Sequence, residues 1–81
     1  MESTTATADG GLVERLRAAR LPAPASRKSI REEAGATLRD IADELAVSPV
    51  TVLRWEQGKS EPRLEHAIRY RRLLDELREI A

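Results

Sequence analysis

The chain has 81 residues with 14 basic and 14 acidic side chains, no cysteine, and 41% apolar residues with almost no aromatic ones. This size and composition support one small domain with a core of Leu, Ile, Val and Ala, and they exclude a disulfide framework and a thiolate metal site. We expect a cytoplasmic protein that does not bind membranes, because there is no secretory signal and no apolar run of roughly 20 residues.

The N-terminal segment predicts a disordered tail followed by a helix. Residues 1–10 are rich in Ser, Thr and Ala and have no apolar periodicity, so we expect them to be disordered. Over 12–20, the apolar side chains recur along one helical face, namely Leu12, Val13 and Leu16. This spacing predicts an additional N-terminal helix.

A proline-containing stretch separates this helix from the next one. Two prolines within 21–26 predict a rigid linker without helix, because proline disrupts the interior of a helix. Ser26 is a suitable N-cap for a second helix over 27–34. Gly35 is expected to end that helix in the left-handed backbone conformation, which glycine adopts without steric cost.

The third predicted helix covers 38–45 and has a clear start. Thr37 and Asp40 have the spacing of a capping box, in which each side chain accepts a hydrogen bond from the backbone N–H of the other. Only Ala46 and Val47 separate the end of this helix from the next N-cap. Two short helices joined so closely must cross steeply, which predicts a helix-turn-helix.

The fourth predicted helix covers 49–57 and begins with a proline. Ser48 is its N-cap, and Pro49 takes the first helical position, where the missing N–H would have no intrahelical partner in any case. Gly58 is expected to end the helix as its C-cap residue.

The last segment predicts one long helix over 63–80. Its first half can close the core, but its apolar stripe continues beyond what that core needs. Either the N-terminal helix or the same stripe of a second chain could cover it. Because the N-terminal helix is short, we predict a homodimer, with an interface made of Tyr70, Leu73, Leu77 and Ile80.

The segment "LRDIADELAVSPVTVLRWEQGKSEP" resembles the helix-turn-helix of the Cro/phage-repressor (Xre) family of transcriptional regulators. The matching features are the small residue Ala42 where the two helices cross, Val52 in the second helix, and Glu56 followed by Gly58. The resemblance implies an all-α, five-helix, lambda-repressor-like DNA-binding domain over 11–81, with an extra N-terminal helix and a long C-terminal helix.

Other positions extend or depart from the family pattern. By spacing, Arg31 and Glu56 occupy the places of a pair that joins the first core helix to the end of the recognition helix. The family usually has glycine where Ala46 stands, a turn position that often needs positive φ, so alanine is expected to be strained there. At the position of Leu38 the family often has glutamine, whose side chain contacts a phosphate. A leucine side chain cannot make this polar contact.

The resemblance also implies that the helix over 49–57 lies in the major groove of double-stranded DNA. Val52 and Trp55 are expected to be structural residues of the core. Arg54 matches guanine O6 and N7, whereas Val50 offers only apolar contact, which favours a thymine methyl group. Side chains at the helix ends and in the following loop hold phosphates. The complete predicted DNA-binding set is Ser48, Pro49, Val50, Thr51, Arg54, Gln57, Lys59 and Arg63.

We therefore expect a sequence-specific transcriptional regulator, most simply a repressor that occupies its operator, and not an enzyme. Because the chain has no catalytic constellation and only one histidine, we expect no cofactor, metal or small-molecule ligand. Two alternatives stay open: an accessory DNA-binding protein of the phage excisionase or antitoxin type, and a protein-interaction adaptor on a helix-turn-helix scaffold. The neutral net charge and the apolar tip at Pro49 and Val50 favour the adaptor slightly.

Overall fold

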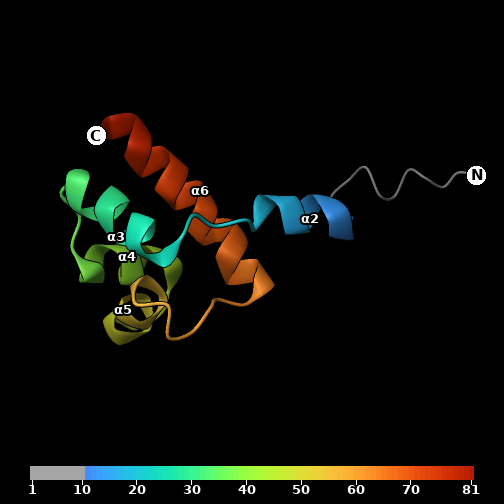
Figure 1. The fold of residues 1–81 in the computed structure, drawn as a ribbon, viewed down its shortest axis with the longest axis horizontal. Coiled ribbons are helices and arrows are strands. Elements are labelled where there is room, and N and C mark those ends of the chain that lie inside the picture. Colours follow the sequence, from blue (N-terminus) through green and yellow to red (C-terminus); the bar gives the residue numbers. More distant parts are fainter. Residues whose placement is uncertain (1–10) are drawn as a thin grey trace, which may run out of the picture.

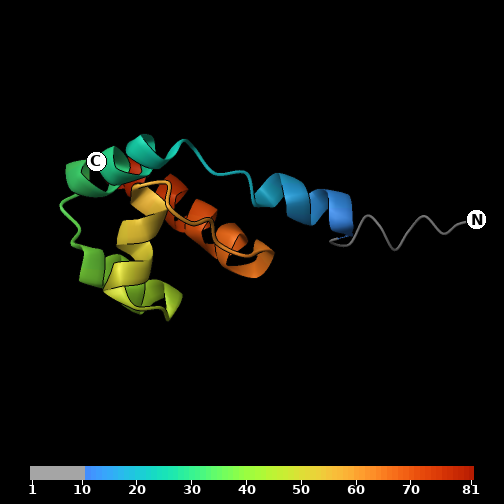
Figure 2. The ribbon, with the colours of Figure 1, turned by 60° about the horizontal axis from the view of Figure 1, so that its bottom comes forward.

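The computed structural model describes residues 11–81, and the predicted disordered tail over 1–10 lies outside the described residues. The described residues form five helices and no strand, which confirms the all-α, five-helix prediction. The helices are α2 (Leu12–Ala18), α3 (Pro24–Glu33), α4 (Leu38–Leu45), α5 (Pro49–Glu56) and α6 (Leu64–Ile80). Helices α3, α4, α5 and α6 pack together, whereas α2 lies beyond an extended linker and contacts only α6 (Figures 1 and 2).

The starts of α4 and α5 follow the predicted local signals. The Thr37 hydroxyl accepts a hydrogen bond from the Asp40 N–H at 3.0 Å, and the Asp40 carboxylate accepts one from the Thr37 N–H at 2.8 Å. The hydrogen bond from the Thr37 N–H to the Asp40 carboxylate, followed by the interaction of that carboxylate with the Thr37 side chain, lowers the pKa of Asp40. Ser48 caps α5 and Pro49 occupies its first turn, as predicted. Local capping chemistry therefore fixes where both helices of the motif begin.

The start of α3 differs from the prediction. The helix begins at Pro24 rather than at residue 27, and its N-cap is Ala23, not Ser26. Pro24 sits in the first turn, where its missing N–H costs nothing, so it starts the helix instead of breaking it. Pro24 therefore stands at the start of α3 as Pro49 stands at the start of α5. The other predicted helix ends agree with the structure within two residues, and Gly35 has the expected positive φ of 79°.

The core forms where α3, α4, α5 and α6 meet. Its aromatic part is built on Trp55, whose ring centroid lies 5.2 Å from that of Tyr70 and 6.1 Å from that of the half-buried His66. Ala42 is fully buried at the crossing of α4 and α5, as its small size predicts, and Val52 is fully buried as well. The buried cluster consists of Ile30, Ile41, Ala42, Leu45, Val52, Trp55, Tyr70 and Leu74.

The structure corrects the predicted role of Tyr70. Its side chain is 1% exposed and lies inside the core, so it offers no surface to a second chain, and the prediction that placed it in a dimer interface is wrong. Helix α6 crosses the motif so closely that Tyr70 and Leu74 are used by the core of the same chain. Leu73 and Leu77 are half-buried at the edge of that core, and Ile80 is 73% exposed.

Helix α2 packs on the N-terminal half of α6 without burying its own apolar side chains. The Arg71 side chain donates a hydrogen bond to the carbonyl oxygen of Arg17 at 2.7 Å, at the C-terminal end of α2. Leu12, Val13 and Leu16 are each more than half exposed, and no residue of α2 is buried. This helix therefore does not cover the apolar stripe of α6, which was one of the two alternatives that the sequence allowed.

Candidate nucleic-acid interface

The turn between α4 and α5 sets the direction of the second helix of the motif. Ala46 has φ 58° and ψ 45°, the left-handed conformation expected at this position. The Val47 N–H then donates to the carbonyl oxygen of Ala42 at 3.0 Å, which closes the turn. Because Ala42 has no side chain beyond its β-carbon, α5 can cross α4 closely at this point.

The outer face of α5 carries the predicted base-reading side chains. Val50 is 60% exposed, and Arg54 is exposed and makes no side-chain hydrogen bond or ion pair with the rest of the described residues. Val52 and Trp55 point into the core, as predicted. Leu53, which precedes Arg54 in the helix, is half-buried.

The remaining members of the predicted set lie at the two ends of α5 and in the loop that follows. Ser48, Gln57, Lys59 and Arg63 are exposed, whereas Pro49 and Thr51 are half-buried. The Lys59 N–H donates to the carbonyl oxygen of Arg54 at 2.9 Å, so the loop starts directly from the last turn of α5. Leu38 is half-buried against the core. Its side chain therefore does not make the phosphate contact that a glutamine makes at this position in the family.

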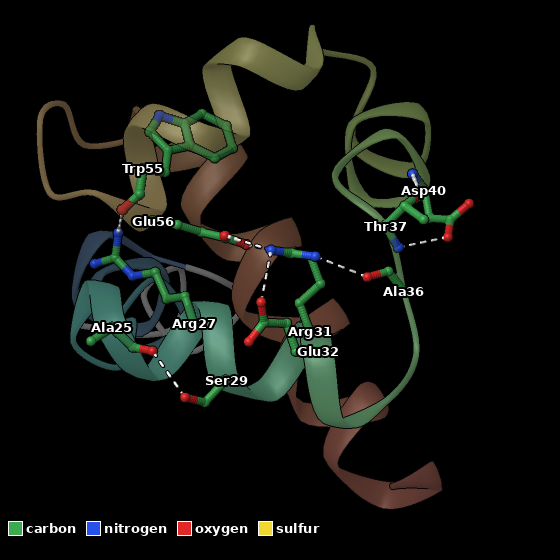
Figure 3. Close-up of polar contacts among 10 residues, drawn as sticks. All are labelled: Ala25, Arg27, Ser29, Arg31, Glu32, Ala36, Thr37, Asp40, Trp55 and Glu56. Carbon is green, nitrogen blue, oxygen red and sulfur yellow. Dashed lines mark hydrogen bonds and ion pairs between the residues drawn. The ribbon is translucent and has the colours of Figure 1, made fainter.

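Arg31 and Glu56 form a bidentate ion pair that joins α3 to the end of α5 (Figure 3). Arg31 Nε lies 2.7 Å from Glu56 Oε2, and Arg31 Nη2 lies 3.0 Å from Glu56 Oε1. The side chains are only 11% and 2% exposed. The hydrogen bond to Glu56 raises the pKa of Arg31, although burial acts in the opposite direction. Arg31 also donates to the carbonyl oxygen of Ala36 at 3.0 Å, which ties the α3–α4 loop to the same pair.

A second buried arginine, Arg27, was missed by the sequence reading. Its three nitrogens donate to three separate segments: the carbonyl oxygen of Pro22 at 2.8 Å, that of Trp55 at 3.1 Å, and the Glu61 carboxylate at 3.0 Å (Figure 3 shows the Trp55 contact). Arg27 lies one turn before Arg31 on α3, so the two share a helical face. That shared face is the signal that could have identified it.

Glu61 lies in the loop between two exposed cations, Lys59 and Arg63. A carboxylate there would oppose contact with phosphate, because like charges repel. Its ion pair with Arg27 offsets that charge. Arg27 therefore supports the candidate interface electrostatically and holds the linker, the end of α5 and this loop together.

Two further findings concern other kinds of site. Over residues 11–81, no group of three or more His, Cys, Asp or Glu side chains is arranged to hold a metal ion. Among the same residues, no helix combines the length and the apolar character that crossing a membrane requires.

Comparison with known families gives a match over most of the chain. The family model described as helix-turn-helix matches residues 28–80, which includes α4, α5 and α6 and most of α3. Comparison with curated proteins and with solved structures returned no match for the chain. The matched segment contains the closed turn at Ala46, the outward Arg54 and the pair of Arg31 with Glu56. The chain belongs to the Cro/phage-repressor (Xre) family of helix-turn-helix DNA-binding regulators.

Proposed function

We propose that this protein is a cytoplasmic, sequence-specific repressor that occupies an operator in double-stranded DNA. The observation that carries the proposal is the exposed, unpaired Arg54 on the outer face of α5, a helix whose far end is fixed by the pair of Arg31 with Glu56. A guanidinium held on a rigid helix can present both donors to guanine O6 and N7 at once. Occupancy of the groove is sufficient to exclude another protein from the same base pairs.

The other exposed polar residues have a different role in this proposal. Ser48 stands at the N-terminus of α5, while Gln57, Lys59 and Arg63 follow from its C-terminal end. Residues at such positions contact phosphates, which sets the register of the helix on DNA but carries no sequence information. Loss of one of these contacts is therefore expected to affect all DNA sequences to a similar degree.

Two matched variants test this division of roles. Arg54→Ala is expected to relax the preference at one base pair and to weaken binding to the preferred site by about 1–3 kcal/mol. Lys59→Ala is expected to weaken all duplexes about equally and to lower the slope of log affinity against log salt by about one. The measurement is fluorescence anisotropy over a salt series, with a site selected from random oligonucleotides and a scrambled duplex.

The same titration separates DNA binding from the alternative function. An unchanged base preference in Arg54→Ala would contradict the assignment of the reading residue. A wild-type protein that binds no duplex even at low salt would favour the protein-interaction adaptor, for which the neutral net charge is the supporting observation.

Repression and an accessory role differ in where the bound site must lie. With the selected site overlapping a promoter, a repressor acting by occupancy lowers transcription in a purified system, while the same site placed far upstream has no effect. If the protein binds the site but transcription is unchanged with the site at the promoter and with the site far upstream, an accessory protein of the excisionase or antitoxin type would be favoured.

We further propose that the chain binds DNA as a homodimer. Leu73, Leu77 and Ile80 continue along one side of α6, with exposure increasing toward its C-terminus. Contact between two such stripes would remove the exposed surface of Ile80 from water, and a two-fold axis would present two α5 helices to successive half-sites. A symmetric dimer of this kind predicts a palindromic operator.

A further inference from the structure

The first turn of α5 presents an apolar tip on the face that is proposed to read DNA. Val50 is 60% exposed, and its neighbours Pro49 and Thr51 are half-buried. Pro49 has no N–H that could donate a hydrogen bond. The most exposed side chain at the beginning of the reading helix can therefore make only apolar contacts.

The two hydroxyl groups nearest to this tip are engaged with each other. The Ser48 Oγ and Thr51 Oγ1 atoms lie 2.9 Å apart, and Ser48 Oγ also accepts a hydrogen bond from the Thr51 N–H at 3.3 Å. Because the two hydroxyls share one hydrogen bond, at most one of their two O–H groups remains to donate elsewhere. Hydrogen-bond reading of bases by this turn is correspondingly reduced.

We propose that Val50 is a second specificity-determining residue, which recognises the C5-methyl group of a pyrimidine in the major groove. The inference rests on the proposed DNA-binding function and names the feature of the DNA that the tip of α5 selects. The C5-methyl group of thymine is the apolar group that natural base pairs present in the major groove, and 5-methylcytosine carries the same group. A valine side chain is complementary to this methyl group.

The position of the methyl group follows from the spacing of the two reading residues. Val50 and Arg54 are four residues apart and lie on one helical face, about 6 Å apart along the helix axis. Successive bases along a DNA strand are separated by about 3.4 Å. We therefore place the methylated pyrimidine about two base pairs from the guanine bound by Arg54.

The experiment varies the methyl group alone. In the selected half-site, the pyrimidine is thymine or uracil opposite adenine in one pair of duplexes and cytosine or 5-methylcytosine opposite guanine in a second pair. The two duplexes of each pair differ only in the methyl group, and affinity is measured by anisotropy. Thymine is expected to bind about fourfold more tightly than uracil, the value of one methyl-sized group removed from water. A similar ratio of 5-methylcytosine to cytosine identifies the methyl group itself as the determinant, whereas equal binding of thymine and uracil, with both bound more tightly than cytosine, would overturn that reading in favour of the O4 acceptor of the pyrimidine.

Two variants locate the effect on the protein. In Val50→Ala, the affinity ratios of thymine to uracil and of 5-methylcytosine to cytosine are both expected to fall close to one. Val50 is exposed, so the substitution should not disturb folding, and a circular dichroism spectrum equal to that of the wild type checks this. Arg54→Ala is the matched control, which is expected to weaken binding while keeping the thymine-to-uracil ratio. Methyl ratios of one at every pyrimidine of a selected site would overturn this inference alone, while failure to select any site would overturn the proposed function.

Discussion

Ala46 holds a backbone conformation that glycine usually adopts. Among the described residues it is the only non-glycine residue with positive φ, and its side chain is exposed. For an L-residue the left-handed conformation costs about 1–2 kcal/mol, which is more than the extra backbone entropy that glycine loses on folding, about 0.5–1 kcal/mol. The turn of the helix-turn-helix therefore stores strain at one position.

Ala46→Gly is expected to stabilise the protein by about 0.5–1 kcal/mol, because it relieves this strain and removes no buried contact. Urea unfolding followed by circular dichroism measures the change. Ala25→Gly is the matched control: Ala25 is exposed in the first turn of α3, so glycine there should destabilise by up to about 1 kcal/mol. Equal losses in both variants would show that the conformation of Ala46 carries no strain.

Tyr70 makes stability depend on pH in the alkaline range. Burial, followed by the negative charge of Glu56, raises the pKa of its hydroxyl to about 12 from 10.0. A group whose pKa is raised in the folded state contributes stability below its unfolded pKa, and that contribution is lost as the pH rises through the folded pKa. The wild type is therefore expected to lose about 2–3 kcal/mol between pH 10 and pH 12.

Tyr70→Phe removes the titrating hydroxyl and is the control for this prediction. The variant should keep the core packing of the ring and should lose less stability than the wild type over the same pH range. The measurement is the urea midpoint at intervals from pH 9 to pH 12. Parallel losses in the two proteins would mean that other groups cause the alkaline destabilisation.

At the scale of elements, α3 and α5 are joined by buried charge. Glu56→Ala leaves Arg31 buried without its carboxylate, and we expect a loss of about 3–5 kcal/mol in the free energy of unfolding. Glu14→Ala is the matched control, since Glu14 pairs with Arg17 on the exposed surface of α2, where an ion pair contributes less than about 1 kcal/mol. A Glu56→Ala protein as stable as Glu14→Ala would contradict the structural role of the pair.

Arg27 joins three further segments. A positive charge alone cannot do so, because the contacts depend on the shape of the guanidinium group. Arg27→Lys is expected to destabilise by about 2 kcal/mol, because a single ammonium group cannot reach Pro22, Trp55 and Glu61 from the positions of three guanidinium nitrogens. Arg20→Lys in the exposed linker should change stability by less than about 0.5 kcal/mol. Urea unfolding compares the two variants, and equal stability would argue against the three-way contact.

At the scale of the whole molecule, two exposed apolar surfaces compete as interfaces. Ile80 lies at the end of the α6 stripe, and Leu16 lies on α2. Under the proposed dimer, Ile80→Glu is expected to shift the wild-type dimer to monomer in sedimentation velocity, whereas Leu16→Glu should leave it dimeric. Both side chains are at least half exposed, so neither change disturbs the core.

The reverse pattern, with dissociation caused only by Leu16→Glu, would place the interface on α2. A wild type that stays monomeric at high concentration, both free and on a palindromic duplex with half-sites about 34 Å apart, would contradict a dimer altogether.

The sequence alone determined the number and order of the helices in this protein and the helix-turn-helix motif among them. Thr37 with Asp40 and Ser48 with Pro49 set helix starts through contacts within four residues, and Gly35 sets a helix end in the same way. Such signals act locally, so they can be read without knowing where the rest of the chain lies. The pair of Arg31 with Glu56 could also be predicted, through the resemblance to a family that has this pair.

Only the tertiary structure decided which segment of the chain, or solvent, each face of a helix contacts. The apolar stripe of α6 looks continuous in the sequence, but Tyr70 falls inside the core while Ile80 falls outside it, because the crossing of α6 over the motif ends between them. Arg27 reads as an ordinary helical arginine until the linker, α5 and the following loop are brought around it. Burial and hydrogen-bond partners arise from contacts between segments distant in sequence, which local patterns do not encode.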